Sequence, residues 1–165
     1  MPPTRLIATL RLFCDREIDF IIVGGIAAVL NGAPVQTYDI DLVYARTPEN
    51  IGRLLPLLRE IDAIFRIQPD RRLRPEETHL NGCGHLNLLT TFGPIDLLAT
   101  IGEGLTYEDL LSQSTSMEIG EGRRVRVLNL ECLIDLKSQS KSAKDTAVIP
   151  ILRQTLIERN KKRPK

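Results

Sequence analysis

The chain has 165 residues, a formal net charge of +1 and an aromatic content of only 4%, with no tryptophan. A chain of this length can bury the core of one domain, whereas a protein that coats nucleic acid needs a strong excess of positive charge and usually aromatic side chains for base stacking. The composition therefore argues against a general nucleic-acid-coating protein. No apolar run approaches the roughly 20 residues that cross a bilayer, so we expect no membrane partner.

The cysteines indicate a reducing compartment. Cys14, Cys83 and Cys132 are isolated in the sequence, and no C-x-x-C pair occurs. An odd number of cysteines among apolar neighbours, with no signal peptide ahead of them, favours buried thiols and a cytoplasmic location. We expect residues 1–160 to form a single domain and residues 161–165 to form a disordered basic tail.

Two apolar segments near the N-terminus flank a glycine pair. Residues 4–16 place their apolar side chains on one helical stripe, which predicts an amphipathic helix. Residues 20–23 are all apolar and predict a buried strand, and Gly24-Gly25 leads from this strand into a short helix. A second strand is expected at about residues 39–44.

The middle of the chain predicts a helix, an irregular segment and a hairpin. Thr47 is followed by proline and is a typical helix N-cap. We expect a short strand near residues 65–67 and then a mobile, arginine-rich loop over the site. Residues 83–90 and 95–100 predict two strands joined by a turn, which would bring Asp96 beside the second strand.

The last third of the chain predicts a hairpin followed by two helices. Residues 117–119 and 125–128 flank a Gly-Glu-Gly turn, and we expect this hairpin to be an added edge of the fold. Asn129 is expected to cap a helix, and a last helix is expected over residues 144–159.

Three lysines are spaced to share one helical face. Lys137, Lys141 and Lys144 follow one another at steps of four and three residues. Like charges on one stripe repel unless an anion lies opposite them, and a polyphosphate would supply that anion. The alternative is an ordinary solvated helix surface.

Three basic clusters offer further anion-binding candidates. They are residues 71–74, residues 123–126 and the tail from residue 161. Arginines on loops and edge strands also serve solubility and prevent strand pairing, and the sequence does not decide between the two roles.

Asp39 and Asp41 are the first candidate catalytic residues. Side chains alternate along a strand, so two carboxylates separated by one residue point to the same face, with Cα atoms about 7 Å apart. Both can then bind one divalent cation or a close metal pair. The alternative for an isolated Asp-x-Asp is solvation or capping at the end of a strand.

Gly24-Gly25 is the second candidate feature. Glycine lets a ligand approach the backbone, and the first N–H groups of the following helix can bind phosphate. The chain contains neither G-x-G-x-x-G nor G-x-x-x-x-G-K-[ST], so it is not a Rossmann or P-loop protein. A tight turn without any ligand is the alternative.

These motifs together resemble a known family. An apolar strand ending in Gly-Gly, thirteen further residues and then Asp-Ile-Asp resemble the signature of the DNA polymerase β-like nucleotidyltransferases. The similarity is greatest to the small prokaryotic branch, which includes minimal nucleotidyltransferases and AbiEii-type toxins. Asp96 matches the third carboxylate of the family, while Lys137 and the pair Lys144-Asp145 match its later basic positions. The resemblance covers roughly residues 20–150.

The resemblance implies an α+β fold, a small mixed sheet flanked by helices with further helices at the C-terminus, and a magnesium-dependent reaction. An acceptor hydroxyl would attack an NTP, receive the NMP and release pyrophosphate. Two Mg²⁺ ions would be held by three carboxylates, Asp39, Asp41 and Asp96, and Asp96 would also take the proton. The residues expected to contact the nucleotide are Gly24, Gly25, Thr37, Lys137 and Lys144.

One position departs from the family pattern and leaves alternatives open. Related sequences often carry an arginine just before Thr37, where this chain has Gln36, so a cation for the triphosphate is missing. A catalytically weak or inactive binding protein that acts through a partner chain is the main alternative to an enzyme. The acceptor could be tRNA, a protein or a small molecule, and a toxin–antitoxin partner is compatible with the resemblance.

Overall fold

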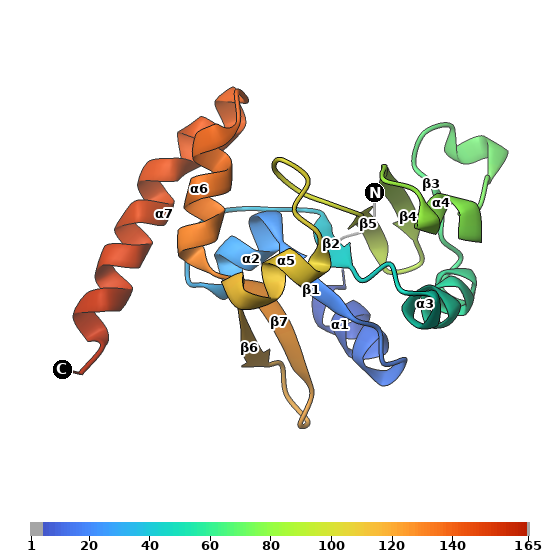
Figure 1. Cartoon of the computed structure of the whole chain (residues 1–165), viewed down its shortest axis with the longest axis horizontal. Helices are drawn as coiled ribbons and strands as arrows, with labels where there is room; N and C mark the ends of the chain where they lie inside the picture. Colours follow the sequence, from blue (N-terminus) through green and yellow to red (C-terminus); the bar gives the residue numbers. More distant parts are fainter. Residues whose placement is uncertain (1–4, 165) are drawn as a thin grey trace.

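The computed structural model describes residues 5–164, which form a seven-stranded mixed sheet flanked by helices (Figure 1). The spatial order of the strands is β3-β4-β5-β2-β1-β7-β6. The expected α+β class is therefore confirmed. The strands are β1 (Phe20–Val23), β2 (Ile40–Tyr44), β3 (Ile64–Phe65), β4 (His85–Thr90), β5 (Gly93–Leu98), β6 (Ser114–Glu118) and β7 (Arg124–Leu128).

Helices lie along the middle of the sheet and at both of its ends. In Figure 1, α6 and α7 lie side by side at one end of the molecule, whereas α4 lies with β3 and β4 at the opposite end. The helices are α1 (Leu6–Asp15), α2 (Gly24–Leu30), α3 (Pro48–Glu60), α4 (Glu77–Asn81), α5 (Tyr107–Leu110), α6 (Leu130–Gln139) and α7 (Ala143–Lys162), with single 3-10 turns η1 (Pro69–Arg71) and η2 (Leu111–Gln113).

The sheet register brings polar side chains of three strands into one row. β2 and β5 are parallel, with Asp41 opposite Asp96, and β4 is antiparallel to β5, with Asn87 opposite Asp96. Residues that face each other across strands point to the same side of a sheet. The neighbouring residues Leu42 and Leu97 point to the other side, where they are completely buried. One face of β2–β5–β4 thus belongs to the core and the other carries carboxylates.

The strand β1 lies between β2 and β7, which run in opposite directions relative to it. It is antiparallel to β2 and parallel to β7, and all four of its residues are buried. The interpretation of the β6–β7 hairpin as an added edge was therefore wrong for β7, which extends the central sheet. Pairing between segments so distant in sequence leaves no local pattern, because it depends only on the fold.

Several local predictions match the observed ends of the elements. Thr47 caps α3 by accepting a hydrogen bond from the Asn50 backbone N–H at 3.2 Å. The turn before Gly93 joins β4 to β5 as expected. By contrast, Cys83 is exposed, so the expectation that all three thiols are buried was wrong.

Two segments differ from the sequence-based expectation. The stretch after Phe65, expected as a loop, contains η1 and α4, and α4 begins with a reciprocal capping box between Glu76 and His79. Near the C-terminus α6 ends at Gln139 and α7 begins at Ala143, so Lys141 lies between two helices and the three lysines do not share one helical face. The helix α7 continues to Lys162, into the expected tail.

Among residues 5–164, no helix combines the length and the apolar character that a bilayer crossing requires.

Candidate active site

The three predicted carboxylates meet where the start of β2 pairs with the middle of β5. Asp41 and Asp96 are register partners on adjacent parallel strands, and, after burial, the Asp96 carboxylate is among the causes that raise the pKa of Asp41. Asp39 precedes β2 by one residue rather than lying within it. Its side chain nevertheless reaches the same place, because one arginine contacts both Asp39 and Asp96. The structure therefore brings the three acids together.

That arginine is Arg66, which the sequence analysis did not single out. Its Nη1 donates to Asp39 Oδ2 at 3.1 Å, and its Nη2 donates to Asp96 Oδ1. Its backbone N–H donates to the Asn87 carbonyl at 2.8 Å, which holds the residue beside β4. No sequence pattern predicts where an arginine that follows an edge strand will place its guanidinium. The one signal in the sequence was that three clustered carboxylates require a nearby cation.

Burial and mutual repulsion change the acidity of the cluster. Burial, followed by the neighbouring Asp96 and Asp39 carboxylates, raises the pKa of Asp41 to about 7, and Lys137 opposes the rise. Burial also raises the pKa of Asp96, against the lowering effect of the Arg66 guanidinium. Burial is the largest cause in both cases, and the Lys137 and Arg66 cations offset only part of it, so a carboxylate of this cluster can hold a proton near neutral pH.

The glycine pair makes room for two site residues. Gly24 has φ +63°, and a Cβ there would lie 2.1 Å from Asp41 Oδ2. A Cβ on Gly25 would lie 2.6 Å from Thr37 Oγ1. Both glycines belong to the first turn of α2 rather than to a separate turn before it. Their backbone therefore lies directly against the carboxylate cluster and the chain that leads into β2.

Lys137 reaches the site from α6 and is held by α7. Its Nζ donates to Asp145 Oδ1 at 2.9 Å, and Ser140 Oγ donates to Asp145 Oδ2 at 2.7 Å. The Ser140 hydrogen bond and then the Lys137 contact lower the pKa of Asp145. Because Lys137 is already paired, it contributes to the site as part of a positioned unit with Asp145, which the resemblance had matched only as the partner of Lys144 in sequence.

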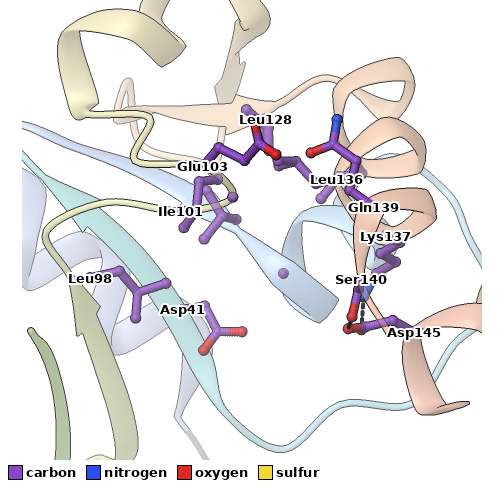
Figure 2. A pocket seen from close by; sticks show the side chains of 14 residues that line it. Asp41, Leu98, Ile101, Glu103, Leu128, Leu136, Lys137, Gln139, Ser140 and Asp145 are labelled. Carbon is purple, nitrogen blue, oxygen red and sulfur yellow. Dashed lines mark hydrogen bonds and ion pairs between the residues drawn. The ribbon is translucent and has the colours of Figure 1, made fainter. Parts of the chain in front are cut away.

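Two clefts share four residues, Gly24, Asp41, Lys137 and Asp145. The first cleft has a volume of about 430 Å³ and largely apolar walls, with Glu103 and Gln139 at its rim (Figure 2). The second cleft has a volume of about 620 Å³ and is lined by all five residues predicted to bind nucleotide, Gly24, Gly25, Thr37, Lys137 and Lys144, and also by Asp39. The lining of neither cleft includes Asp96.

The comparisons with known proteins identify the fold. No protein-family model matches the sequence, and no curated protein does. A crystal structure of a "putative nucleotidyltransferase" from Thermotoga maritima superposes with a TM-score of 0.52 and 18% sequence identity, over 94% of this chain and 96% of that one. The chain has the nucleotidyltransferase fold. This likeness does not single out the AbiEii-type branch.

The donor set of this nucleotidyltransferase fold suits a hard divalent cation. Carboxylate oxygens are the ligands that Mg²⁺ prefers, and burial together with the neighbouring Asp96 and Asp39 carboxylates raises the pKa of Asp41, an effect that a bound cation would oppose. Within residues 5–164, however, no three His, Cys, Asp or Glu side chains are already arranged as a metal-binding group. The carboxylates are therefore suitable ligands for Mg²⁺. In this structure, however, the Arg66 guanidinium lies between two of them, Asp39 and Asp96.

The basic clusters differ from this site because acidic or polar partners contact most of their arginines. Arg72 and Arg74 both pair with Asp62, and Arg123 pairs with Asp15 and Glu121. Arginines 124 and 126 bond to serines of β6. These contacts favour a structural role for the clusters around residues 71–74 and 123–126 over a dedicated anion-binding role.

Proposed function

We propose that the protein is a nucleotidyltransferase that moves an NMP from an NTP to a hydroxyl acceptor. The observation that carries this proposal is the register pair of Asp41 and Asp96, with Asp39 beside them and the Gly24 backbone against them, in a nucleotidyltransferase fold. Three acids within one half-buried cluster are costly without a cationic ligand. A protein without a catalytic use for them has no physical need to gather them.

Asp39, Asp41 and Asp96 would hold the divalent cations, two Mg²⁺ ions in the full proposal. When bound, Mg²⁺ neutralises charge on the reacting phosphate and lowers the pKa of the attacking hydroxyl. The backbone of Gly24 and Gly25 would contact the phosphates.

The second cleft is the proposed triphosphate site. Its wall carries Thr37, Lys137 and Lys144, so two ammonium groups lie where a polyphosphate would need neutralisation. Lys137 is the better positioned of the two, because Asp145 holds it at 2.9 Å. The missing arginine at Gln36 is thus offset by lysines from the two C-terminal helices.

The acceptor would approach from the side of β4 and β5. Asp96 lies on that side of Asp41, and the exposed residues Asn87 and His85 of β4 continue the same face. In the reaction a bond forms between the acceptor oxygen and the α-phosphorus, the bond from that phosphorus to the pyrophosphate oxygen breaks, and Asp96 takes the hydroxyl proton. Pyrophosphate leaves along the lysine side of the site.

A specific observation also supports the alternative of a binding protein that acts through a partner chain. Arg66 neutralises part of the acid cluster, as a residue would do in a site no longer used for catalysis. In that case a partner chain, such as one half of a toxin–antitoxin pair, would bind the protein without any transfer reaction.

One labelling experiment separates the two proposals. The protein is incubated with each α-³²P-labelled NTP, Mg²⁺ and a cell extract, and the products are resolved into tRNA, protein and small molecules. A nucleotidyltransferase labels one of these classes, and Asp41→Asn abolishes the label. A binding protein labels nothing with any NTP, and that result would remove the enzymatic proposal.

A further inference from the structure

Arg66 has an unusual position for a structural arginine. It contacts Asp39 and Asp96 through two different Nη atoms, so its guanidinium lies between two of the three acids. The side chain is 27% exposed, and those of Asp39 and Asp96 are 37% and 17% exposed. The guanidinium thus occupies the place where a cation bound by these carboxylates would have to lie.

The hydrogen bonding of Arg66 is incomplete. Its Nε is buried and has no hydrogen-bond partner among the described residues. An arginine with a purely structural role usually binds a carboxylate through two parallel N–H groups and leaves no buried donor unpaired. Here each carboxylate receives one Nη, and the third donor is left without a partner. The contact neutralises charge, but its geometry is not that of an optimised ion pair.

The backbone of Arg66 is fixed by hydrogen bonds that do not involve its side chain. The Arg66 N–H binds the Asn87 carbonyl, and the preceding Phe65 N–H binds the Leu73 carbonyl at 2.8 Å. These bonds close the segment 66–72 at the edge of the sheet. A rotation of the long side chain can therefore release the acids without breaking β3 or β4.

We propose that Arg66 is an internal counterion that holds Asp39 and Asp96 in the ligand-free protein and is displaced when a divalent cation binds these carboxylates. This inference rests on the proposed function, because it takes the three acids as the cation ligands. Mg²⁺ must compete with the Arg66 guanidinium for Asp39 and Asp96. The affinity for Mg²⁺ is therefore lower than the three carboxylates alone would give. It also prevents mutual repulsion from separating the acids before the cation arrives.

The decisive experiment is calorimetric titration of Mg²⁺ into the wild type and Arg66→Met. Methionine keeps the apolar stem and removes the charge. Arg74→Met is the matched control, because Arg74 belongs to the same segment and pairs with Asp62 instead of the acid cluster. We expect Arg66→Met to bind Mg²⁺ about tenfold more tightly, a difference of about 1.4 kcal/mol, and the control to bind like the wild type. An equal or weaker affinity of Arg66→Met overturns the inference.

A second measurement uses the wild type alone and does not depend on the folding of a variant. The Arg66 side-chain Nε–H resonance is followed by ¹⁵N NMR during titration with Mg²⁺. Displacement predicts that this resonance shifts with the same Mg²⁺ dependence as the calorimetric signal, while the Arg74 resonance stays in place. A bound cation with an unchanged Arg66 resonance contradicts the inference.

The two proposals fail in different ways. If Arg66 is displaced by Mg²⁺ but no NTP labels any acceptor, the counterion role stands and the enzymatic function falls. If transfer occurs and removal of Arg66 does not tighten Mg²⁺ binding, only the counterion role falls. If neither the wild type nor Arg66→Met binds Mg²⁺, both fall.

Discussion

The two ends of one short segment, residues 66–74, carry opposite arrangements of charge. At one end Arg72 and Arg74 share the single carboxylate of Asp62, at the surface. At the other end Arg66 alone serves Asp39 and Asp96, beside Asp41. The hydrogen bond from Arg72 lowers the pKa of Asp62, whereas burial raises the pKa of Asp41 and Asp96.

This contrast separates a structural ion pair from a candidate active site. The Asp62 cluster has more positive than negative charge, lies in solvent and needs no ligand. The Asp39, Asp41 and Asp96 cluster is half-buried and has three carboxylates for the one guanidinium of Arg66, so a further cation and an anionic substrate can complete it. Substitutions at the two ends of the segment should therefore have very different effects.

The largest effect is expected from Asp41→Asn. We expect transfer activity to fall by about 10²–10³-fold or more, because the variant loses a carboxylate from the centre of the site. In metal-free buffer at pH 8 the same variant should have a higher Tm than the wild type, since it removes a charge that burial and two acids disfavour. The measurements are the labelling assay and thermal unfolding. Full activity of the variant would contradict the mechanism.

The next effect concerns the glycine that touches Asp41. Gly24→Ala combines a positive φ with a Cβ that would lie 2.1 Å from Asp41 Oδ2, so it should displace the carboxylate and lower both Tm and activity. Gly32→Ala is the matched control, because Gly32 also has a positive φ, +95°, but a Cβ there meets nothing within 4 Å. The control should lose some stability and keep its activity. Equal losses of activity would show that backbone strain alone accounts for the effect.

The pH dependence of stability gives an effect of intermediate size. Between the unfolded pKa of 3.8 and the folded pKa of about 7, the folded protein holds the Asp41 proton and the unfolded chain does not. The contribution of Asp41 to the free energy of unfolding therefore falls as pH rises through this window. Thermal unfolding of metal-free protein from pH 4 to pH 8 should show the Tm of Asp41→Asn rising relative to that of the wild type as the pH increases. Identical profiles would argue against a raised pKa.

The smallest effect is expected at the other end of the segment. Asp62→Asn removes the partner of two exposed arginines, and exposed ion pairs contribute little to stability. We expect a change in Tm below about 3 °C and unchanged transfer. The same two assays measure it. A loss of activity comparable to that of Asp41→Asn would abolish the distinction between the two clusters.

The acid cluster could be predicted from the sequence because each of its parts depends on the pattern of a few neighbouring residues. Alternation along β2 places Asp41 on one face, and the β4–β5 hairpin, marked by its turn, brings Asp96 opposite it. The cap at Thr47 and the amphipathic stripe of α1 are equally local. Features set by a few neighbouring residues can be predicted without the fold.

The rest could not be predicted because it depends on contacts between distant segments. Arg66 is one of several arginines in a polar stretch, and only the pairing of β3 with β4 places its guanidinium at the acids. The parallel pairing of β7 with β1 joins residues more than a hundred positions apart. The break between α6 and α7 places Asp145 against Lys137, which no periodicity indicates.

The most direct test of the central claim is a crystal soaked with Mn²⁺ and a non-hydrolysable NTP, with anomalous data collected for manganese. We predict an anomalous peak in contact with Asp41 and Asp96, a triphosphate against Gly24, and a guanidinium of Arg66 that no longer contacts both acids. A triphosphate bound elsewhere, with no manganese at these carboxylates, would contradict the account.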